Sequence, residues 1–304
     1  LSLRKGRVHT LLGENGAGKS TLMKILAGVY PPTQGTITLR GETITINNPQ
    51  HSRQLGIAII FQELSLSNNM TVAENIYANN EPRRFGIIND KKMLADCQNL
   101  LAELGIPLDP LEMVGNMSMA HRQLVEIAKA LSYAADVVIM DEPTSMFNVE
   151  DAAKVTELTR RIASMGIGII YISHFLNEVV EIADRITVIR DGAVISTFSN
   201  ENHDTPITKI TQDMVGRPID MFYDREKCPI GDVMLEVKDL QLTKDSPKIN
   251  FTVHKGEIVG FSGMVGSGRT EMMRASGRRR QPSTAGTSTI NGKEVQIKDP
   301  NDSY

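Results

Sequence analysis

The chain has 304 residues, of which 40% are hydrophobic, and carries a formal net charge of −3. Its length predicts two domains, or one domain and part of another. The small negative charge argues against a general nucleic-acid binder. No window approaches the run of about 18 uncharged apolar residues that a membrane span needs, and the start has no signal-peptide pattern. The two cysteines, Cys97 and Cys228, lack metal-type spacing, which favours reduced thiols in a cytoplasmic protein.

The first residues predict a strand, a turn and a second strand. Leu1–Lys5 looks like a strand that runs into a Lys5-Gly6 turn, and we expect that a strand before it is missing from this sequence. Val8–Leu12 predicts a short strand. Ser20–Ala27 has its leucines and isoleucine on one face and predicts a helix, which Gly28 ends.

The loop between this strand and this helix has the sequence Gly13-Glu14-Asn15-Gly16-Ala17-Gly18-Lys19-Ser20. It fits the pattern GxxxxGK(S/T), in which backbone N–H groups point at nucleotide phosphates and the helix adds the positive end of its dipole. Lys19 would reach the β- and γ-phosphates, and the Ser20 hydroxyl would hold Mg²⁺. The residues predicted to bind nucleotide here are Gly13, Asn15, Gly16, Ala17, Gly18, Lys19, Ser20 and Thr21.

Further along, a small hairpin is predicted at residues 36–39 and 43–46, around Arg40-Gly41-Glu42. Ile57–Phe61 is then a short buried strand that delivers Gln62 at its C-terminal end. Ligands of open parallel sheets lie at the carboxyl ends of strands, so Gln62 is a candidate site residue.

From Thr71 to about Ala135 the pattern is helical, with a break at Gly105–Pro110. One helix carries apolar residues at helical spacing around Cys97. A second helix begins after Ser118, which is a good N-cap residue. This stretch therefore predicts a helical insert.

Two more buried strands end in polar residues. Val137–Met140 runs into Asp141 and Glu142, and Ile167–Ile172 runs into His174. Between them, a helix capped by Asn148 is expected. A last hairpin is predicted for residues 186–197, around Asp191-Gly192.

These strand ends together supply what phosphoryl transfer to water requires: charge neutralisation, a metal and an oriented water. Asp141 would hold Mg²⁺, with Ser20 and Gln62 also at the metal. Glu142 would orient or deprotonate the attacking water. Gln62 would reach the same water from one side, and His174 would stabilise the γ-phosphate. The predicted catalytic residues are Glu142, His174, Gln62 and Lys19.

The chain contains an internal repeat that follows a linker of mixed charge at residues 218–232. Lys5-Gly6 recurs as Lys255-Gly256, and Lys19 is matched by Arg269, both at an offset of 250 residues. A fixed register of this kind indicates a repeated domain. Residues 235–240 are the predicted lead-in strand of the second copy.

The second loop has an arginine where the first has a lysine. Its candidate nucleotide-binding residues are Gly263, Gly266, Gly268, Arg269 and Thr270. A planar guanidinium does not fit the lysine's place without rearrangement, so we expect binding with poor hydrolysis. The alternative is a loop kept only for packing.

With these motifs in this order, the chain resembles the ATP-binding cassette family over nearly its whole length. Met117–Gln123 occupies the position of the family's signature and keeps only its serine, Ser118. The degenerate signature and the second loop, Gly268-Arg269-Thr270, look like the fused ATPase subunits of bacterial monosaccharide importers of the ribose, galactose and xylose type.

The resemblance implies an α/β fold of the P-loop NTPase (ABC) type, with a small antiparallel β-subdomain and a helical subdomain. The implied domains are a first cassette at residues 1–217, the linker at 218–232, and the N-terminal part of a second, degenerate cassette at 233–304. It also implies a nucleotide sandwich with a complete second cassette, in which Ser118 would cover the Arg269 loop. Lys19 would need a second signature, and we expect slow hydrolysis without it.

By the same resemblance, ATP and Mg²⁺ are the cofactors, and hydrolysis would energise import of a monosaccharide. Two integral-membrane permease subunits would be the partners, with a periplasmic sugar-binding protein acting indirectly and no nucleic acid. The chain would lie peripherally at the cytoplasmic face of the bacterial inner membrane. The alternatives are a soluble tandem-cassette protein of the translation-factor type and a chain that only binds nucleotide.

Overall fold

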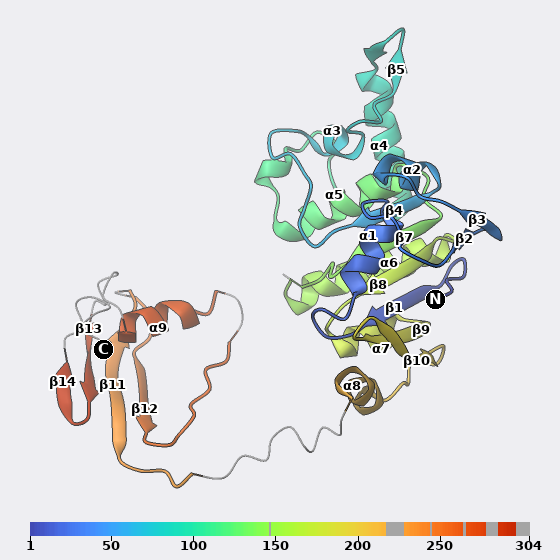
Figure 1. The fold of residues 1–304 in the computed structure, drawn as a ribbon. Coiled ribbons are helices and arrows are strands. Elements are labelled where there is room, and N and C mark those ends of the chain that lie inside the picture. Colours follow the sequence, from blue (N-terminus) through green and yellow to red (C-terminus); the bar gives the residue numbers. More distant parts are fainter. Residues whose placement is uncertain (146, 217–227, 244, 264–265, 278–284, 296–304) are drawn as a thin grey trace. The chain divides into compact units, whose positions relative to one another are not determined.

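The computed structural model of the chain describes all residues except 146, 217–227, 244, 264–265, 278–284 and 296–304 (Figure 1). The chain divides into two compact units, Leu1–Phe222 and Tyr223–Tyr304. Most of the predicted linker at 218–232 lies outside the described residues, so its bounds stay a prediction. Among the described helices, none has the length and apolar character to cross a membrane.

The first unit is built from short strands and helices. Its strands are β1 (Val8–Leu12), β2 (Ile37–Leu39), β3 (Glu42–Ile44), β4 (Ile57–Ile60), β5 (Arg83–Arg84), β6 (Ile87–Ile88), β7 (Val137–Asp141), β8 (Gly168–Ile172), β9 (Arg185–Arg190) and β10 (Ala193–Ser199). Its helices are α1 (Lys19–Leu26), α2 (Pro49–Gln54), α3 (Val72–Ile76), α4 (Asp90–Leu104), α5 (Met119–Leu131), α6 (Val149–Ser164), α7 (Leu176–Ile182) and α8 (Ile207–Val215), with a 3₁₀ turn at Val114–Asn116.

A six-stranded sheet with the order β10-β9-β1-β8-β7-β4 forms the centre of this unit. Its strands run parallel, apart from the edge strand β10, which pairs antiparallel with β9. Successive side chains of a strand point to opposite faces. In β7, accordingly, Val138 and Met140 join one hydrophobic cluster and Ile139 joins another.

Helices cover both faces of the sheet. The larger cluster packs α3, α4, α5 and α6 on one face, and the other cluster packs α1 with the β2–β3 hairpin on the opposite face. Cys97, a free thiol of α4, is fully buried in the larger cluster, and burial raises its pKa to about 11. The exposed Cys228 is also free.

Two predictions in this unit were wrong. Residues 1–4 form no strand: they line one pocket together with the β2–β3 hairpin, and no described strand pairs with them. Leu3 instead packs against the cluster beneath α1. The stretch from Thr71 to Ala135 is not helical throughout, since the β5–β6 hairpin separates α3 from α4.

The described residues of the second unit form a four-stranded antiparallel sheet and one helix. The elements are β11 (Val233–Gln241), β12 (Ile249–His254), α9 (Arg269–Gly277), β13 (Ala285–Ile290) and β14 (Lys293–Val295), and the sheet order is β12-β11-β13-β14. A small core of Val237, Leu240 and Met272 joins the sheet to α9.

The repeat seen in the sequence is visible in the backbone. The β2–β3 turn has φ of 53° at Arg40 and 88° at Gly41, and the β13–β14 turn has 51° at Asn291 and 75° at Gly292. One equivalence fails: residues 258–262, which match β1, form no strand, and Ile258 is 74% exposed. In the first unit, β1 gains both neighbours from residues 168–190, and the described part of the second unit supplies no parallel strand.

Gly28, just after α1, lies in close contact with the backbone of Asn48. It has φ of +73°, and an added Cβ would lie 2.5 Å from the carbonyl group of Asn48. Gly35 has φ of +96° but open space around it. We expect Gly35→Ala to cost about 1–2 kcal/mol, the penalty of a left-handed residue. Gly28→Ala adds the clash and is expected to cost about 3 kcal/mol.

Urea unfolding of both variants, followed by circular dichroism, measures the two costs. Equal losses of unfolding free energy would contradict the packing argument.

Candidate active site

The loop at residues 13–18 joins β1 to α1 with the geometry of an anion-binding turn. A Cβ at Gly13 would stand 2.2 Å from the backbone oxygen of Ile189, so only glycine fits there. Gly16 and Gly18 have φ of 86° and 101°. Because α1 begins at Lys19, the amides of its first turn lack intrahelical partners. They are available to an anion such as a phosphate.

Lys19 holds its ammonium group over this loop. Its Nζ donates to the backbone oxygens of Gly13 at 2.7 Å and Glu14 at 3.1 Å. Burial lowers the pKa of Lys19, and the negative charges of Glu142 and Asp141 oppose that shift. The lysine and both carboxylates therefore share one electrostatic environment, as their positions in the sequence predicted.

The carboxylates lie where β7 ends. Asp141 is its last residue, and Glu142 follows with φ of +49°, a conformation that non-glycine residues adopt rarely. The Glu142 amide donates to the Ile172 oxygen of β8 at 2.9 Å, and the Ser145 hydroxyl donates to the Glu142 oxygen at 3.1 Å. The strained residue is thus fixed from both sides, which is typical of functional positions.

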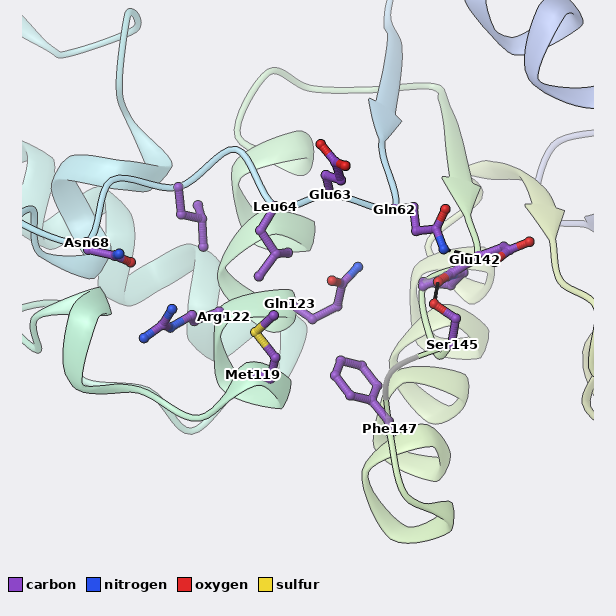
Figure 2. A pocket seen from close by; sticks show the side chains of 12 residues that line it. Gln62, Glu63, Leu64, Asn68, Met119, Arg122, Gln123, Glu142, Ser145 and Phe147 are labelled. Carbon is purple, nitrogen blue, oxygen red and sulfur yellow. Dashed lines mark hydrogen bonds between the residues drawn. The ribbon is translucent and has the colours of Figure 1, made fainter. Parts of the chain in front are cut away.

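Gln62 and His174 both contact the Glu142 side chain. The Gln62 amide nitrogen donates to Glu142 Oε2 at 3.1 Å (Figure 2). His174 Nδ1 lies 3.4 Å from Glu142 Oε1. One carboxylate thus joins the ends of β4, β7 and β8. The structure brings Lys19, Gln62, Asp141, Glu142 and His174 together, and Ser20 follows Lys19 in the first turn of α1.

A pocket of about 320 Å³ adjoins Glu142. It lies between residues 62–68, which follow β4, and the first turn of α5 (Figure 2). Gln123 of α5 is only 5% exposed, and its side-chain nitrogen has no hydrogen-bond partner among the described residues. Met119 and Phe147 line the same pocket. The pocket thus separates the Glu142 site from the N-terminus of α5.

A buried polar cluster, which the sequence did not predict, links the segment after Glu142 to the end of β8. Glu178 of α7 accepts hydrogen bonds from the hydroxyls of Thr144, at 2.9 and 3.0 Å, of Ser173, at 3.3 Å, and of Tyr171. Thr144 lies two residues after Glu142, and Ser173 directly precedes His174. Glu178 therefore ties the segment after Glu142 to the His174 loop. In the sequence it is one more acidic residue of an amphipathic helix.

Ser118 makes no side-chain hydrogen bond to these residues in the described part of the chain. Ser118 caps α5, as predicted, and its hydroxyl accepts from the His121 amide at 3.2 Å. In the second unit, Gly266 and Gly268 have φ of 83° and 84°, and α9 begins at Arg269. Residues 264–265 are outside the described part. Gly263, Arg269 and Thr270 are exposed, and their binding role stays a prediction.

A parallel sheet with helices on both faces, a glycine-rich loop between β1 and α1, and carboxylates at the end of β7 are the features of the P-loop nucleotide-binding fold. Residues 1–145 match the family model described as ABC transporter. This match places residues 1–145 in the family of ATP-binding cassette proteins.

Within the family, the chain is similar to ribose/galactose/methyl galactoside import ATP-binding proteins. It is 46% identical to one from Hahella chejuensis over 99% of this chain and 58% of the relative. It is 48% identical to one from Rhizobium meliloti over 98% of this chain and 58% of the relative. The chain thus spans a little over half the length of these relatives.

Solved structures show the same fold. A nucleotide-free ATP-binding cassette from an ABC transporter superposes with a TM-score of 0.61 at 24% identity, covering 70% of this chain and 87% of that one. An ATP-binding cassette of an ABC transporter in its ADP conformation gives 0.62 at 24%, covering 71% and 91%.

Asp141 is expected to reduce stability as the pH rises. Burial first, and then Glu142, raises its pKa, so its proton is held more tightly in the folded than in the unfolded state. Stability is therefore lost as the pH rises from about 4, the unfolded pKa, through the higher folded pKa. At neutral pH, Asp141→Asn is expected to raise the unfolding free energy by about 0.5 kcal/mol, because solvent screens part of the effect.

Urea unfolding at several pH values measures this, with Asp204→Asn, an exposed aspartate, as the charge-matched control. A lower stability of Asp141→Asn would contradict the expectation.

Glu178→Ala is expected to lower the unfolding free energy by about 2–4 kcal/mol, because the buried hydroxyls of Thr144 and Tyr171 lose their acceptor. Glu178→Gln keeps an acceptor oxygen and should lose less. Glu181, which forms an exposed ion pair with Arg160, is the control; Glu181→Ala should cost about 0–1 kcal/mol. Thermal and urea unfolding of the three variants check the order, and equal losses for Glu178→Ala and Glu181→Ala would exclude the cluster as a stabilising element.

Proposed function

We propose that the first unit binds and hydrolyses Mg²⁺-ATP and that this hydrolysis energises import of a monosaccharide through an ABC transporter. The observation that carries the proposal is the meeting of Lys19, Gln62, Glu142 and His174 at one edge of the sheet. The names of the related import ATP-binding proteins support the monosaccharide as cargo.

The loop and Lys19 fit a polyphosphate. Nothing within 4 Å would meet a Cβ on Gly16, so the loop is open to a ligand there. The free amides of α1 and the Lys19 ammonium would bind the phosphate oxygens. The glycines and Asn15, Ala17 and Thr21 of the same loop complete the proposed nucleotide site.

Mg²⁺ prefers oxygen ligands such as a hydroxyl, an amide oxygen and a carboxylate. It usually binds through one or two protein groups together with the phosphates of the substrate. Ser20, Gln62 and Asp141 supply them. The described residues contain no cluster of three or more His, Cys, Asp or Glu that could hold a metal without the nucleotide. When bound, Mg²⁺ would neutralise charge on the phosphates.

Glu142 is the group that would orient the attacking water and accept its proton. Gln62 and His174 already contact its two oxygens, so the carboxylate is held in place before a ligand arrives. His174 is 55% exposed at its side chain and free to turn toward a γ-phosphate. Its proposed task is to stabilise the charge there.

The partners follow from the import role. We infer that the chain works at the cytoplasmic face of the bacterial inner membrane with two integral-membrane permease subunits, and indirectly with a periplasmic sugar-binding protein. The second unit is inferred to be part of a second cassette, supported by the matching backbone at the Arg40 and Asn291 turns. In a nucleotide sandwich, Ser118 would then face the Arg269 loop.

Two substitutions separate binding from hydrolysis. Lys19→Ala is expected to weaken ATP binding about tenfold or more, because the phosphates lose their charge partner. Glu142→Gln should keep the affinity and slow hydrolysis about 100-fold, since an amide cannot accept the proton. Fluorescent ATP-analogue titration and single-turnover hydrolysis, with protein in excess, measure the two steps.

Glu150→Gln, an exposed change in α6, is the control. Wild-type rates for Glu142→Gln would refute the assigned role. Membranes that contain monosaccharide permeases are expected to stimulate hydrolysis by the wild-type chain. If they do not, the import role is refuted, while the proposed ATP hydrolysis stands.

A further inference from the structure

The β5–β6 hairpin places apolar side chains in solvent at its tip. It projects beyond the start of α4 (Figure 1). Phe85 is 93% exposed, more than any other large hydrophobic side chain among the described residues, and Ile87 is 74% exposed. Ile88 is 44% exposed. Single exposed apolar side chains are ordinary, whereas several gathered at one projecting tip are candidates for an interaction site.

The turn itself is strained at Phe85. Phe85 and Gly86 form its two central residues, with φ of 53° and 82°. Turns with two left-handed residues favour Asn-Gly, because a bulky side chain is disfavoured in this conformation. An aromatic ring held there against local preference points to a role for the side chain.

The register of the hairpin places the arginines and isoleucines on both of its faces. Arg83 pairs with Ile88, and Arg84 pairs with Ile87. Residues directly opposite each other share one face of a hairpin, so each face carries one arginine and one isoleucine. A protein groove that covers either face would bury an arginine. A lipid interface, by contrast, would surround the tip on all sides, because arginine stems can lie along apolar layers while their charged heads stay in the polar region.

The charges around the tip suit anionic headgroups. The Arg84 guanidinium lies 5.6 Å from the centre of the Phe85 ring. Arg83 reaches Glu81 at 3.3 Å and remains 62% exposed. Lys91 and Lys92 follow at the start of α4, where Lys92 forms an ion pair with Asp96 at 2.9 Å. Residues 81–92 thus hold four basic and two acidic side chains, in a chain whose net charge is −3.

We propose that the β5–β6 hairpin inserts Phe85 and Ile87 into the interfacial layer of an anionic lipid bilayer, while Arg83 and Arg84 bind the phosphates of its headgroups. Arginine binds phosphate oxygens in a bidentate fashion. Basic residues near an anionic surface add to the apolar contribution of the tip.

A single-tryptophan variant tests the insertion directly. The chain has no tryptophan, so Phe85→Trp reports only on the tip. Vesicles of phosphatidylcholine and phosphatidylglycerol in equal parts are expected to shift its emission to the blue. Val194→Trp, at an exposed position of β10, should show no shift.

Phe85→Asn separates binding from folding. Asparagine suits the left-handed turn, so this variant should be at least as stable as the wild type. Its partition to the mixed vesicles in a co-sedimentation assay is expected to fall about tenfold, as the ring no longer leaves water. Arg83→Gln with Arg84→Gln should abolish the preference for vesicles that contain phosphatidylglycerol over pure phosphatidylcholine.

An unchanged Phe85→Trp emission, or wild-type partition of Phe85→Asn, would overturn the proposal. A shift that needs membranes containing permease subunits, and is absent with lipid alone, would overturn it in favour of a protein partner. The assays use no nucleotide, so their outcome is independent of ATP hydrolysis by the first unit.

Discussion

The parallel pairing of β7 with β8 and β4 is the constraint on which the site depends. Asp141 lies opposite Ile172, and Ile60 lies opposite Met140, so all three strands end at the same level. Because the register is fixed by the burial of most side chains of these apolar strands, Gln62, Glu142 and His174 meet although 112 positions separate the first from the last. The chemistry is thus an outcome of sheet packing.

A second level of support comes from Glu178. Its carboxylate gathers three hydroxyls from the segment after Glu142 and from the end of β8. Thr144, Tyr171 and Ser173 are buried, so these hydrogen bonds are protected from water. Movement of the segment after Glu142 would therefore be transmitted to the His174 loop through one side chain.

Much of this could be predicted from the sequence, because strand ends and helix caps are local signals. Val8–Leu12, the Ser118 and Asn148 caps and the phosphate loop are where the patterns indicated. The Glu178 cluster could not be predicted, since it depends on how α7 packs behind the sheet. The β5–β6 hairpin was missed because its strands are two residues long and its turn lacks Asn-Gly. Leu1–Lys5 shows the converse: an alternating apolar pattern is not sufficient for a strand, since this segment pairs with none of the described strands.

The contrast between β1 and residues 258–262 has a consequence for biosynthesis. Similar segments form a strand only where neighbours from residues 168–190 lie on both sides. On the ribosome, the middle of the first sheet therefore cannot close until about the length of a full cassette has emerged, because pairings distant in sequence form late. The phosphate loop, although encoded within the first 20 residues, is therefore expected to be among the last parts of the first unit to gain its final shape.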